Sequence, residues 1–435
     1  MKVLKFGGTS VGSAENMRMV SEIIQSEGSR VTVLSAMSET TNGLVKICAS
    51  ASNGIFEKES FDYLKAKYTK CVENLLKSQD EALTKIESAF SYIKQQAENF
   101  TTTSENNILA QGELLTTAIF TMFLNESGLK ARLLNVPEYM QTNSEGRADE
   151  SHLDQTLGNI VKSEDSSVFF VTQGFICTNH LGELDNLGRG GSDYSAALIG
   201  AAIDADEVQI WTDIDGMHNN DPRYVENTYP IHKMSFTQAA ELAYFGAKIL
   251  HPATIQPCKK RGIPVRLKNT LDAAAEGTLI TNCEDDNTSK YLAVAAKDGV
   301  ISIRINSARM LMAYGFLRRL FEVFEKYKTP IDMITTSEVA VTLTIDSDED
   351  LEGIVADLKP FGNVSYEKNN SIICVVGDID PSEKGVVAKI LDSITDIPVK
   401  MISYGASDNS VAFMISSENK IEALRKLNCA LFENH

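Results

Sequence analysis

The sequence has few cysteines, no long apolar run and a deficit of positive charge. Its seven cysteines are an odd number without a C-x-x-C pair, which favours reduced thiols over disulfides or a zinc cage. No apolar run reaches about 18 residues and no apolar leader opens the chain, so we expect neither a membrane span nor export, and a cytoplasmic location. The formal net charge of -18 argues against binding to nucleic acid or anionic lipid. A local basic pocket for a small anion is compatible with these absences.

The rest of the composition is that of a soluble globular chain. With 435 residues, of which 43% are apolar and 23% charged, the chain suits two or three domains. Short β-branched runs at 3–6 and 30–34 flank a helical pattern over 14–25. This βαβ order predicts an α/β fold with a mostly parallel sheet, whose functional groups gather beyond the carboxyl ends of the strands.

The first predicted strand leads directly into two glycines and two hydroxyls, in Lys5-Phe-Gly-Gly-Thr-Ser10. Gly7 and Gly8 would let the backbone turn with positive φ and bring its N–H groups near an anion, while Lys5 and Ser10 add donors. Lys5 precedes the glycines, so the pattern is not that of a P-loop. An ordinary turn also explains two glycines after a strand, so the phosphate interpretation needs support from elsewhere in the chain.

The strongest local pattern is Gly188-Arg-Gly-Gly-Ser-Asp193, which opens an alanine-rich helix. Glycines at a helix start leave backbone N–H groups open to an anion, and the helix dipole favours negative charge there. Arg189 adds a planar fork that suits a carboxylate or a phosphate. Ser192 and Asp193 alone would be an N-cap and a first-turn acid, but that account leaves the glycines around Arg189 unexplained. The pattern therefore predicts an anion site.

Other candidate residues follow further predicted strands. Ser35 and Thr41 lie after the second strand, where turn or N-cap chemistry explains them as well as a site does. Phe175 follows a near-continuous apolar run that is typical of a buried parallel strand. Glu113 interrupts an otherwise apolar helical pattern, and it is either solvated or borders a cleft.

Two later segments also point toward the sheet edge. The acidic loop 213–223, which contains Asp213 and ends in Arg223, is compatible with a nucleotide, a metal or an acid-rich turn. Lys248, in Gly246-Ala-Lys-Ile-Leu-His-Pro252, is placed to reach the sheet edge or to act as a cation at a helix C-terminus.

The pattern changes after a polar linker near 282–289. Short strands and two helices over 300–367 make a βαββαβ unit, and a second unit starts at 371 but lacks its last strand. We expect a lone strand over 291–296 to supply that missing edge by threading between the domains. The echo of 334–340 in 402–412 supports a duplication.

Together these motifs resemble those of aspartokinases, members of the amino-acid kinase family. The resemblance rests on Lys5-Phe-Gly-Gly-Thr-Ser10, Gln111-Gly-Glu113, Gly174-Phe175, Gly188-Arg-Gly-Gly-Ser-Asp193, Trp211-Thr-Asp213, Asp221-Pro-Arg223 and Gly246-Ala-Lys-Ile-Leu-His-Pro252. It implies an αβα sandwich in residues 1–283 and two ferredoxin-like βαββαβ ACT domains at 299–368 and 369–435, the second completed by strand 290–298. The length resembles the monofunctional, lysine-sensitive type, without a fused homoserine dehydrogenase.

The resemblance implies transfer of the ATP γ-phosphoryl group to the β-carboxylate of L-aspartate, with Mg²⁺ bridging the phosphates. The product would be 4-phospho-L-aspartate, in the first step of lysine, threonine and methionine biosynthesis. A carboxylate is already ionised at neutral pH, so this chemistry needs no general base. It needs alignment of the reactants and neutralisation of charge.

The resemblance also implies roles for individual residues. The catalytic residues would be Lys5, Gly8, Asp193 and Lys248. Lys5 would touch both reactants and Asp193 would orient Lys5 or Mg²⁺. Aspartate would contact Ser35, Thr41, Glu113, Phe175, Arg189 and Ser192. Within this set, Arg189 would pair with the α-carboxylate and Glu113 with the α-ammonium.

The implied nucleotide side comprises Lys5, Gly7, Gly8, Ser10, Thr212, Asp213, His218, Arg223 and Lys248. His218 stands where many relatives place a tyrosine beside the adenine, and its ring is still able to stack. No direct metal ligand is assigned.

A regulatory site is implied in the first ACT unit, formed by Met310, Gly315, Phe316, Leu317, Asp332, Thr336, Ser337 and Glu338. Asp332 suits the cationic end of a lysine effector. Met312, Ala313 and Pro330 depart from lysine-sensitive relatives, so threonine, or loss of feedback, stays an alternative. The resemblance also implies a homodimer through the ACT domains, or a tetramer, because exposed sheet edges are otherwise left unpaired.

Two other functions are compatible with the sequence. One is a kinase of the same fold that acts on glutamate, acetylglutamate or a nucleotide. The other is a catalytically inactive amino-acid sensor. The retained Lys5, Glu113, Arg189 and Asp193 argue against the sensor.

Overall fold

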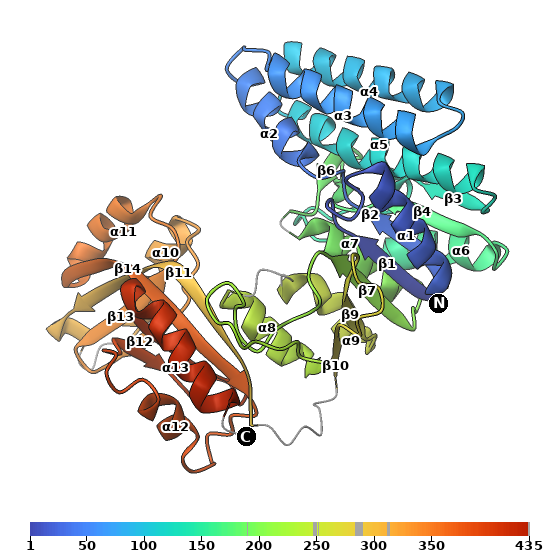
Figure 1. The fold of residues 1–435 in the computed structure, drawn as a ribbon. Helices are drawn as coiled ribbons and strands as arrows, with labels where there is room; N and C mark the ends of the chain where they lie inside the picture. The colour runs from blue at the N-terminus through green and yellow to red at the C-terminus, as the bar shows by residue number, and fades with distance from the viewer. Residues whose placement is uncertain (189, 247–249, 251, 283–289, 311–313, 434–435) are drawn as a thin grey trace. The chain divides into compact units, whose positions relative to one another are not determined.

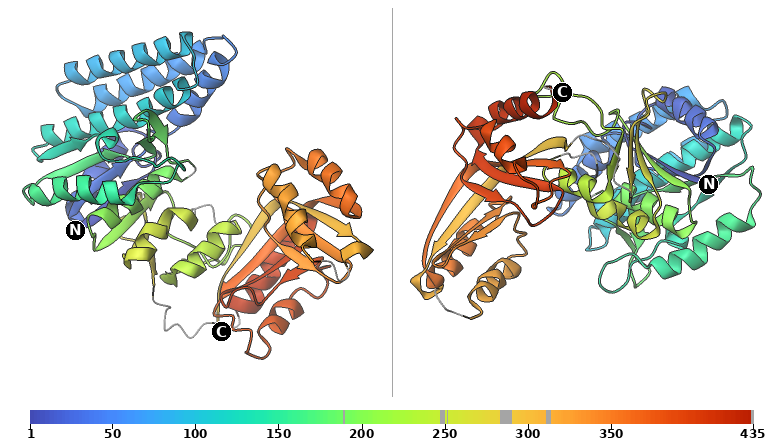
Figure 2. Two further views of the ribbon diagram at one scale, coloured as in Figure 1. Left: turned by 180° about the vertical axis from the view of Figure 1, so that it is seen from behind. Right: turned by 90° about the horizontal axis from the view of Figure 1, so that it is seen from below.

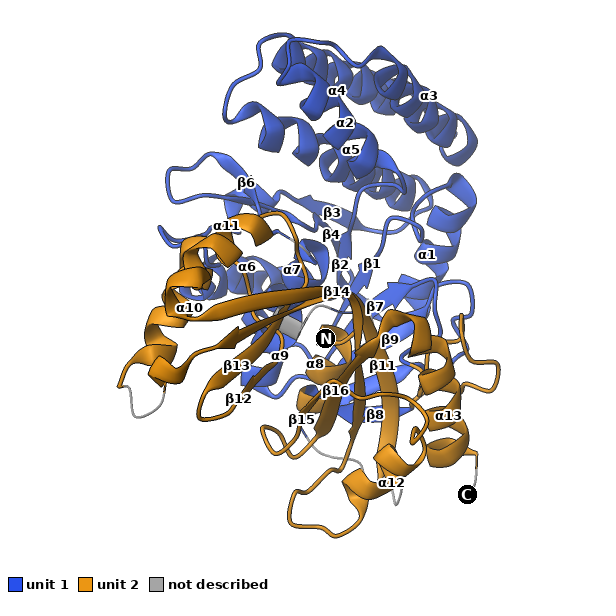
Figure 3. Cartoon of the chain, turned by 90° about the vertical axis from the view of Figure 1, so that its left-hand side faces the viewer, with its two compact units in different colours: residues 1–217, 232–236, 250–284 blue, residues 218–231, 237–249, 285–435 orange. Residues whose placement is uncertain are grey.

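The computed structural model describes residues 1–435 apart from 189, 247–249, 251, 283–289, 311–313 and 434–435. The chain forms two compact units (Figure 3). The first contains residues 1–217, 232–236 and 250–284, and the second contains residues 218–231, 237–249 and 285–435. The segments 218–231 and 237–249 therefore belong to the same compact unit as the C-terminal sheet.

An eight-stranded sheet with the order β3-β4-β2-β1-β7-β9-β10-β8 forms the centre of the first unit (Figure 1). Its strands are β1 (Lys2–Phe6), β2 (Ser29–Leu34), β3 (Ala131–Leu134), β4 (Phe169–Gln173), β7 (Glu207–Thr212), β8 (Lys233–Ser235), β9 (Val265–Asn269) and β10 (Thr278–Thr281). Every neighbouring pair is parallel except β9 and β10. The mostly parallel sheet predicted from the βαβ pattern is confirmed.

Helices cover both faces of this sheet, which makes the predicted αβα sandwich (Figures 1 and 2). One layer consists of α1 (Ala14–Ser26), α2 (Thr40–Ala51), α3 (Lys58–Leu75), α4 (Asp80–Glu98) and α5 (Ser104–Glu126). The other contains α6 (Glu150–Ser163), α7 (Gly191–Ala202) and α9 (Gln256–Arg261). A short hairpin of β5 (Ile176–Thr178) and β6 (Leu184–Asn186) follows β4.

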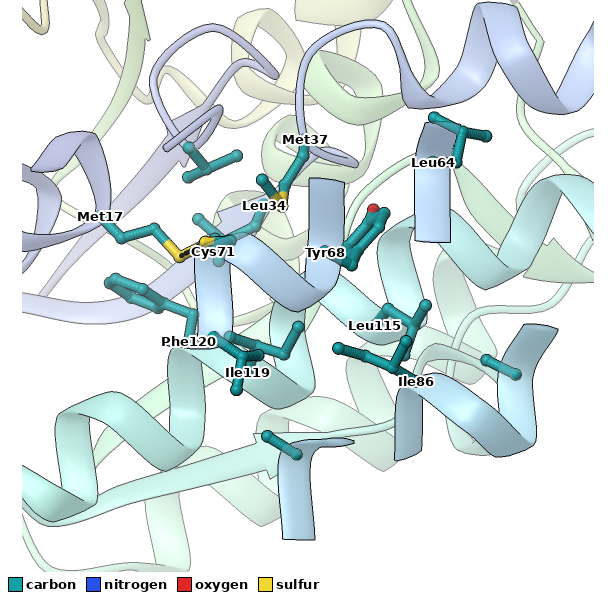
Figure 4. Packing of buried hydrophobic residues seen from close by; sticks show 14 of the residues in the cluster. Met17, Leu34, Met37, Leu64, Tyr68, Cys71, Ile86, Leu115, Ile119 and Phe120 are labelled. Carbon is teal, nitrogen blue, oxygen red and sulfur yellow. Dashed lines mark hydrogen bonds between the residues drawn. The ribbon is translucent and has the colours of Figure 1, made fainter. Parts of the chain in front are cut away.

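The helical layer of α1 to α5 shares one apolar core with the sheet (Figure 4). Met17 of α1, Cys71 of α3 and Phe120 of α5 meet in it, because apolar residues recur at helical spacing on each helix. Among the described residues, α5 alone has the length and composition of a membrane-spanning helix, and 72% of its apolar window is buried inside the protein. Such burial is typical of the core helix of a folded domain.

A six-stranded sheet with the order β12-β13-β11-β14-β16-β15 forms the centre of the second unit. The strands are β11 (Tyr291–Asn306), β12 (Ile334–Thr336), β13 (Ala340–Ile345), β14 (Asn363–Gly377), β15 (Met401–Ser403) and β16 (Ser410–Ser416), and all pairs are antiparallel. The helices are α8 (Phe236–Tyr244), which begins in the first unit, α10 (Phe316–Lys326), α11 (Leu351–Leu358), α12 (Val386–Asp392) and α13 (Lys420–Phe432).

The strand predicted over 291–296 and the strand that follows it are one continuous strand in the structure. The first part of β11 pairs with Ile372 to Gly377 of β14, and its second part pairs with both β14 and β13. A register shift between Lys297 and Val300 lies where Gly299 has φ +75°, so a glycine absorbs the irregularity instead of ending the strand. Both ACT-like halves thus share two long strands.

Each half of the long strand pair has its own apolar core. One core contains Tyr291, Val294 and residues of α12 and α13, and the other contains Ile301, Ile303 and residues of α10 and α11. Two cores on one sheet agree with the duplication that the sequence indicated.

Candidate functional site

The first strand and the glycine-rich helix entry, predicted separately to bind anions, meet in the first unit. Nζ of Lys5, near the end of β1, lies 2.6 Å from Oδ1 of Asp193, in the first turn of α7. The side chains are 12% and 14% exposed, so the ion pair is largely shielded from water, although its geometry is not that of an aligned hydrogen bond. A shielded cation at the carboxyl end of a parallel sheet suits an anionic ligand.

Neither glycine after β1 is required by a positive φ, and close packing requires only the second of them, which is a correction to the sequence argument. Neither Gly7 nor Gly8 has a positive φ. A Cβ on Gly8 would lie 2.7 Å from the carbonyl oxygen of Ala36, and the amide of Ser38 donates to the Gly8 carbonyl at 2.9 Å. The loops after β1 and β2 therefore lie against each other, and a side chain at Gly8 would push them apart.

Ser10 is engaged at the same edge. Its buried hydroxyl lies 2.7 Å from that of Thr270, just after β9. Thr212 ends β7 and its carbonyl accepts a hydrogen bond from the Thr270 amide at 2.8 Å, while its hydroxyl donates to the exposed Asp213 at 3.0 Å. The nucleotide-side candidates Ser10, Thr212 and Asp213 thus lie around the ends of β1, β7 and β9.

Glu113 is buried and borders the loop after β2, so it is not a solvated surface residue. It is 3% exposed, and its Oε1 accepts a hydrogen bond from the Ala36 amide at 3.2 Å. The fit depends on Gly112, because a Cβ there would lie 2.8 Å from Cβ of Ala36. Burial raises the pKa of Glu113 to about 7.

The second oxygen of Glu113, Oε2, has no hydrogen-bond partner among the described residues. A buried carboxylate with a free oxygen is costly to leave unpaired, and it is typical of a site that receives a cationic ligand. The hydroxyl of Thr40, buried at the start of α2, is also unpartnered within the described part of the chain. Sequence reasoning selected the neighbouring Thr41, which is exposed, and missed Thr40.

The substrate-side candidates after β2 and β4 also meet. Ser35 donates to Ser192 at 3.0 Å, joining the end of β2 to the start of α7. Gly174 packs against the same serine, since a Cβ there would lie 2.7 Å from Cβ of Ser192. Phe175 follows with φ +69°, a strained conformation for a non-glycine residue, and its amide donates to Ser195 at 3.1 Å. The segment is held in place despite that strain.

The helix α7 starts at Gly191, and its N-cap is Gly190 with φ +71°. Among the described residues no side chain caps it, and the Gly191 amide donates to the Gly188 carbonyl at 3.0 Å. Two of the predicted site residues, Arg189 and Lys248, lie outside the described residues.

Two other nucleotide-side candidates belong to the second unit. His218 Nδ1 lies 3.1 Å from the Thr228 hydroxyl, and the exposed Arg223 forms an ion pair with Asp221 at 2.6 Å. Within the residues that the structure describes, no group of three or more His, Cys, Asp or Glu side chains is arranged to hold a metal ion.

The predicted regulatory residues lie in the second unit, except for Met312 and Ala313, which fall outside the described residues. Gly315 is the N-cap of α10 with φ +73°, and Phe316 is buried against Phe361, while Leu317 packs on the same core. Met310 ends a short 3-10 helix before α10, and the remaining four lie at β12: Asp332 just before it, Thr336 as its last residue, and Ser337 and Glu338 directly after it. The Asp332 side chain is 1% exposed.

Comparison with known proteins agrees with this arrangement. The amino acid kinase family model matches residues 1–269, and an ACT domain model matches residues 373–431. The lysine-sensitive aspartokinase 3 of Escherichia coli is 32% identical over 99% of the chain and 99% of its own length. Aspartokinase 1, chloroplastic, of Arabidopsis thaliana is 33% identical over 99% of the chain and 80% of its own length.

A solved structure extends the likeness to the whole chain. The crystal structure of E. coli aspartokinase III in complex with aspartate and ADP superposes with a TM-score of 0.88 and 31% identity, and covers 99% of this chain and 100% of that one. The family model and these relatives place the chain in the aspartokinase family, and the ion pair of Lys5 with Asp193 at the sheet edge agrees with it.

Proposed function

We propose that the protein is an aspartate kinase, which uses ATP to phosphorylate the β-carboxylate of L-aspartate. The observation that carries the proposal is Glu113, a buried carboxylate with one free oxygen at the sheet edge that also holds the Lys5 cation. An amino-acid substrate with a second carboxylate brings an ammonium for Glu113 and an anion for Lys5. The E. coli relative whose structure contains aspartate and ADP supports this assignment.

The chemistry depends on positioning and charge. The β-carboxylate is ionised at neutral pH and attacks the γ-phosphorus directly, so no proton has to be removed. Lys5 neutralises the phosphoryl oxygens as ADP leaves, and Asp193 holds the Lys5 ammonium in place. Glu113 binds the α-ammonium and Arg189 the α-carboxylate. Ser35, Thr41, Phe175 and Ser192 line the substrate side.

The proposal assigns the phosphates to the loop of Gly7, Gly8 and Ser10, and a further part of the nucleotide to Thr212 and Asp213 in the same unit. His218, Arg223 and Lys248 stay predictions from the resemblance. The donor set at the edge, with Asp193 as its shielded carboxylate, fits a Mg²⁺ ion that is carried mainly by the phosphates. Such an ion supplies charge neutralisation between the β- and γ-phosphates when bound.

Feedback control completes the proposal. Lysine is the effector, bound in the second unit near Asp332, in keeping with the lysine-sensitive E. coli relative. The protein acts in the cytoplasm as a homodimer paired through its ACT-like sheets, in which a second copy covers the edge strand β12, whose three residues are all exposed.

The activity is tested by incubating the protein with ATP, Mg²⁺ and single amino acids, with hydroxylamine to trap any acyl phosphate as a hydroxamate. L-Aspartate should give hydroxamate. L-Glutamate should give little because its side chain is one methylene longer, and N-acetyl-L-glutamate because it lacks the ammonium that Glu113 binds. Hydroxamate from glutamate but not from aspartate would reassign the substrate. If no amino acid gave hydroxamate, the alternative of a catalytically inactive amino-acid sensor would be favoured.

A further inference from the structure

A cluster of charged side chains surrounds Asp332 in the second unit. Oδ1 of Asp332 accepts a hydrogen bond from the Tyr244 hydroxyl at 2.6 Å and lies 2.6 Å from Nζ of Lys297. Lys297 also lies 3.0 Å from Oδ2 of Asp346, and its ammonium is 4.7 Å from the centre of the Tyr244 ring. The cluster joins the last residue of α8, the middle of β11 and the segments that flank β12 and β13.

The formal charges in the cluster do not balance. It contains the two carboxylates of Asp332 and Asp346 and the single ammonium of Lys297, which leaves one negative charge. Oδ2 of Asp332 has no hydrogen-bond partner among the described residues, although the side chain is only 1% exposed. A buried carboxylate oxygen without a donor is a vacant position for a further cation.

The same cluster ties down the end of α8. The strand β8 belongs to the catalytic sheet, α8 follows it directly, and residues 237–249 lie in the regulatory unit. Gly246 has φ +131°, and a Cβ there would lie 2.0 Å from the carbonyl oxygen of Ala296, the residue before Lys297. The backbone after α8 therefore touches β11 beside the cluster. Tyr244 connects this segment to Asp332.

We propose that Lys297 is an internal competitor for the effector ammonium at Asp332, and that Tyr244 reports the exchange to α8. This inference rests on the proposed function, because it specifies how the proposed lysine effector acts. The effector ε-ammonium binds the free oxygen of Asp332, and repulsion between two cations on one carboxylate displaces Lys297 toward Asp346. Because one cation replaces another, neither carboxylate is left buried without a partner at the end of the exchange. The Lys297 ammonium then leaves the face of the Tyr244 ring, which weakens the anchor of α8 on β11.

The geometry also specifies the class of effector. Oδ1 is already used by two donors, so the single free oxygen suits the compact ammonium of an alkyl amine. A guanidinium, which binds a carboxylate through both oxygens, requires Lys297 and Tyr244 to leave first. L-Lysine should therefore bind better than L-arginine. L-Norleucine, which has the same aliphatic chain without the ε-ammonium, should not bind.

The test measures L-lysine binding to the full-length protein by titration calorimetry, without nucleotide or aspartate. Lys297→Met removes the competitor and should tighten lysine binding about fivefold or more, the lower end of common coupling energies. Lys297→Arg installs a stronger carboxylate partner and should weaken binding by a similar factor. Lys368→Met is the matched control, because Lys368 forms its ion pair with Asp348 in the same unit. It should bind lysine as the wild type does.

The two Lys297 variants should change the affinity for L-lysine in opposite directions, so one variant still tests the proposal if the other folds poorly. If Lys297 only stabilises the fold, the affinity for L-lysine should fall in both Lys297 variants or change in neither. Either result overturns the proposal. Loss of binding in Asp332→Asn is expected, and lysine binding unchanged in that variant also overturns it. Tyr244→Leu, which lacks the aromatic ring, should bind lysine at least as tightly as the wild type, yet its kinase activity should be less inhibited at saturating lysine.

The binding measurement separates this inference from the proposed function. If aspartyl hydroxamate forms normally but Lys297→Met leaves lysine binding unchanged, the competitor role alone fails. If no aspartyl hydroxamate forms but the two Lys297 variants shift lysine binding in opposite directions, the kinase assignment alone fails. Wild-type protein that binds no lysine, with active kinase, also overturns the competitor role.

Discussion

The ammonium of Lys5 lies 2.6 Å from a carboxylate oxygen of Asp193, although 188 positions separate the two residues in the chain. Lys5 lies near the end of the first strand and Asp193 in the first turn of α7. Their contact makes one charged site from two patterns that the sequence presents separately. The account of catalysis depends on this pair and on the partly free carboxylate of Glu113.

Replacement of Lys5 by arginine tests whether this cation bridges both reactants. The bulkier, planar guanidinium does not fit between the phosphoryl group and the acceptor carboxylate, so kcat should fall about 100-fold or more. Lys2→Arg is the matched control, since Lys2 lies on the same strand and pairs with Glu27. If Lys5→Arg kept full turnover, the bridging role would be withdrawn.

Glu113→Gln tests the ammonium site. The loss of one charge should raise KM for aspartate roughly 30-fold or more, with a smaller effect on kcat, because a buried charge partner contributes about 2–5 kcal/mol to binding. KM for ATP should stay within about twofold of the wild-type value. An unchanged aspartate KM would remove Glu113 from the substrate site.

The pKa of Glu113 predicts the pH dependence of the same step. The free protein holds this carboxyl with a pKa of about 7, and ammonium binding needs the ionised form. The value of kcat/KM for aspartate should therefore rise as pH increases through about 7 and level off above it. In Glu113→Gln this inflection should be absent. A wild-type profile that is flat between pH 6 and 8 would contradict the assignment.

The same pKa makes a prediction for stability without ligand. The folded-state pKa of Glu113 is raised from 4.5 to about 7, so the native state binds more protons than the unfolded state between these values. The contribution of this group is fully present below about pH 4.5 and is lost as pH rises to about 7, a decrease of up to about 3 kcal/mol. Glu113→Gln should therefore be more stable than the wild type at pH 8. Denaturant unfolding at pH 5 and pH 8 measures the difference, and a variant less stable than the wild type at pH 8 contradicts it.

A positioning role is expected for Lys67 of α3. Its ammonium donates to the Ser38 carbonyl and lies 3.3 Å from Glu39, which also accepts a hydrogen bond from Tyr63 at 2.6 Å. Glu39 has φ +65°, so these contacts hold a strained turn between the loop against Gly8 and the start of α2.

Loss of this contact should loosen the substrate loop. Lys67→Met should raise KM for aspartate about tenfold, from roughly 1–2 kcal/mol of lost hydrogen bonding, and Lys67→Arg should restore most of it. Lys65→Met is the control on the same helix, since Lys65 pairs with Glu87 on α4. A purely structural role would lower the melting temperature of Lys67→Met and leave its KM unchanged.

The sequence predicted the sheet and the residues at its edge because strand order in a βαβ chain determines which loops meet. It did not predict how closely those loops pack. The need for glycine at position 8 comes from the Ala36 carbonyl, and the burial of Glu113 comes from the contact of Gly112 with that segment. Local secondary-structure propensity predicts neither contact.

Local sequence patterns also did not predict the cluster at Asp332. Tyr244, Lys297 and Asp332 come from three separate parts of the chain, and they meet because 237–249 packs with the C-terminal sheet. The sequence marked Asp332 as a regulatory candidate only through its resemblance to a family. It contained no signal that Lys297 already occupies the carboxylate.

The central claim is phosphoryl transfer to the side-chain carboxylate of aspartate. The most direct test is ³¹P NMR of the reaction of ATP with L-aspartate whose β-carboxylate is labelled with ¹⁸O. The account predicts an acyl phosphate resonance with the isotope shift of an ¹⁸O bridge, absent from the Lys5→Arg reaction. An acyl phosphate resonance without the isotope shift would contradict the account. So would formation of ADP without any acyl phosphate, provided that a control incubation shows the acyl phosphate product to be stable.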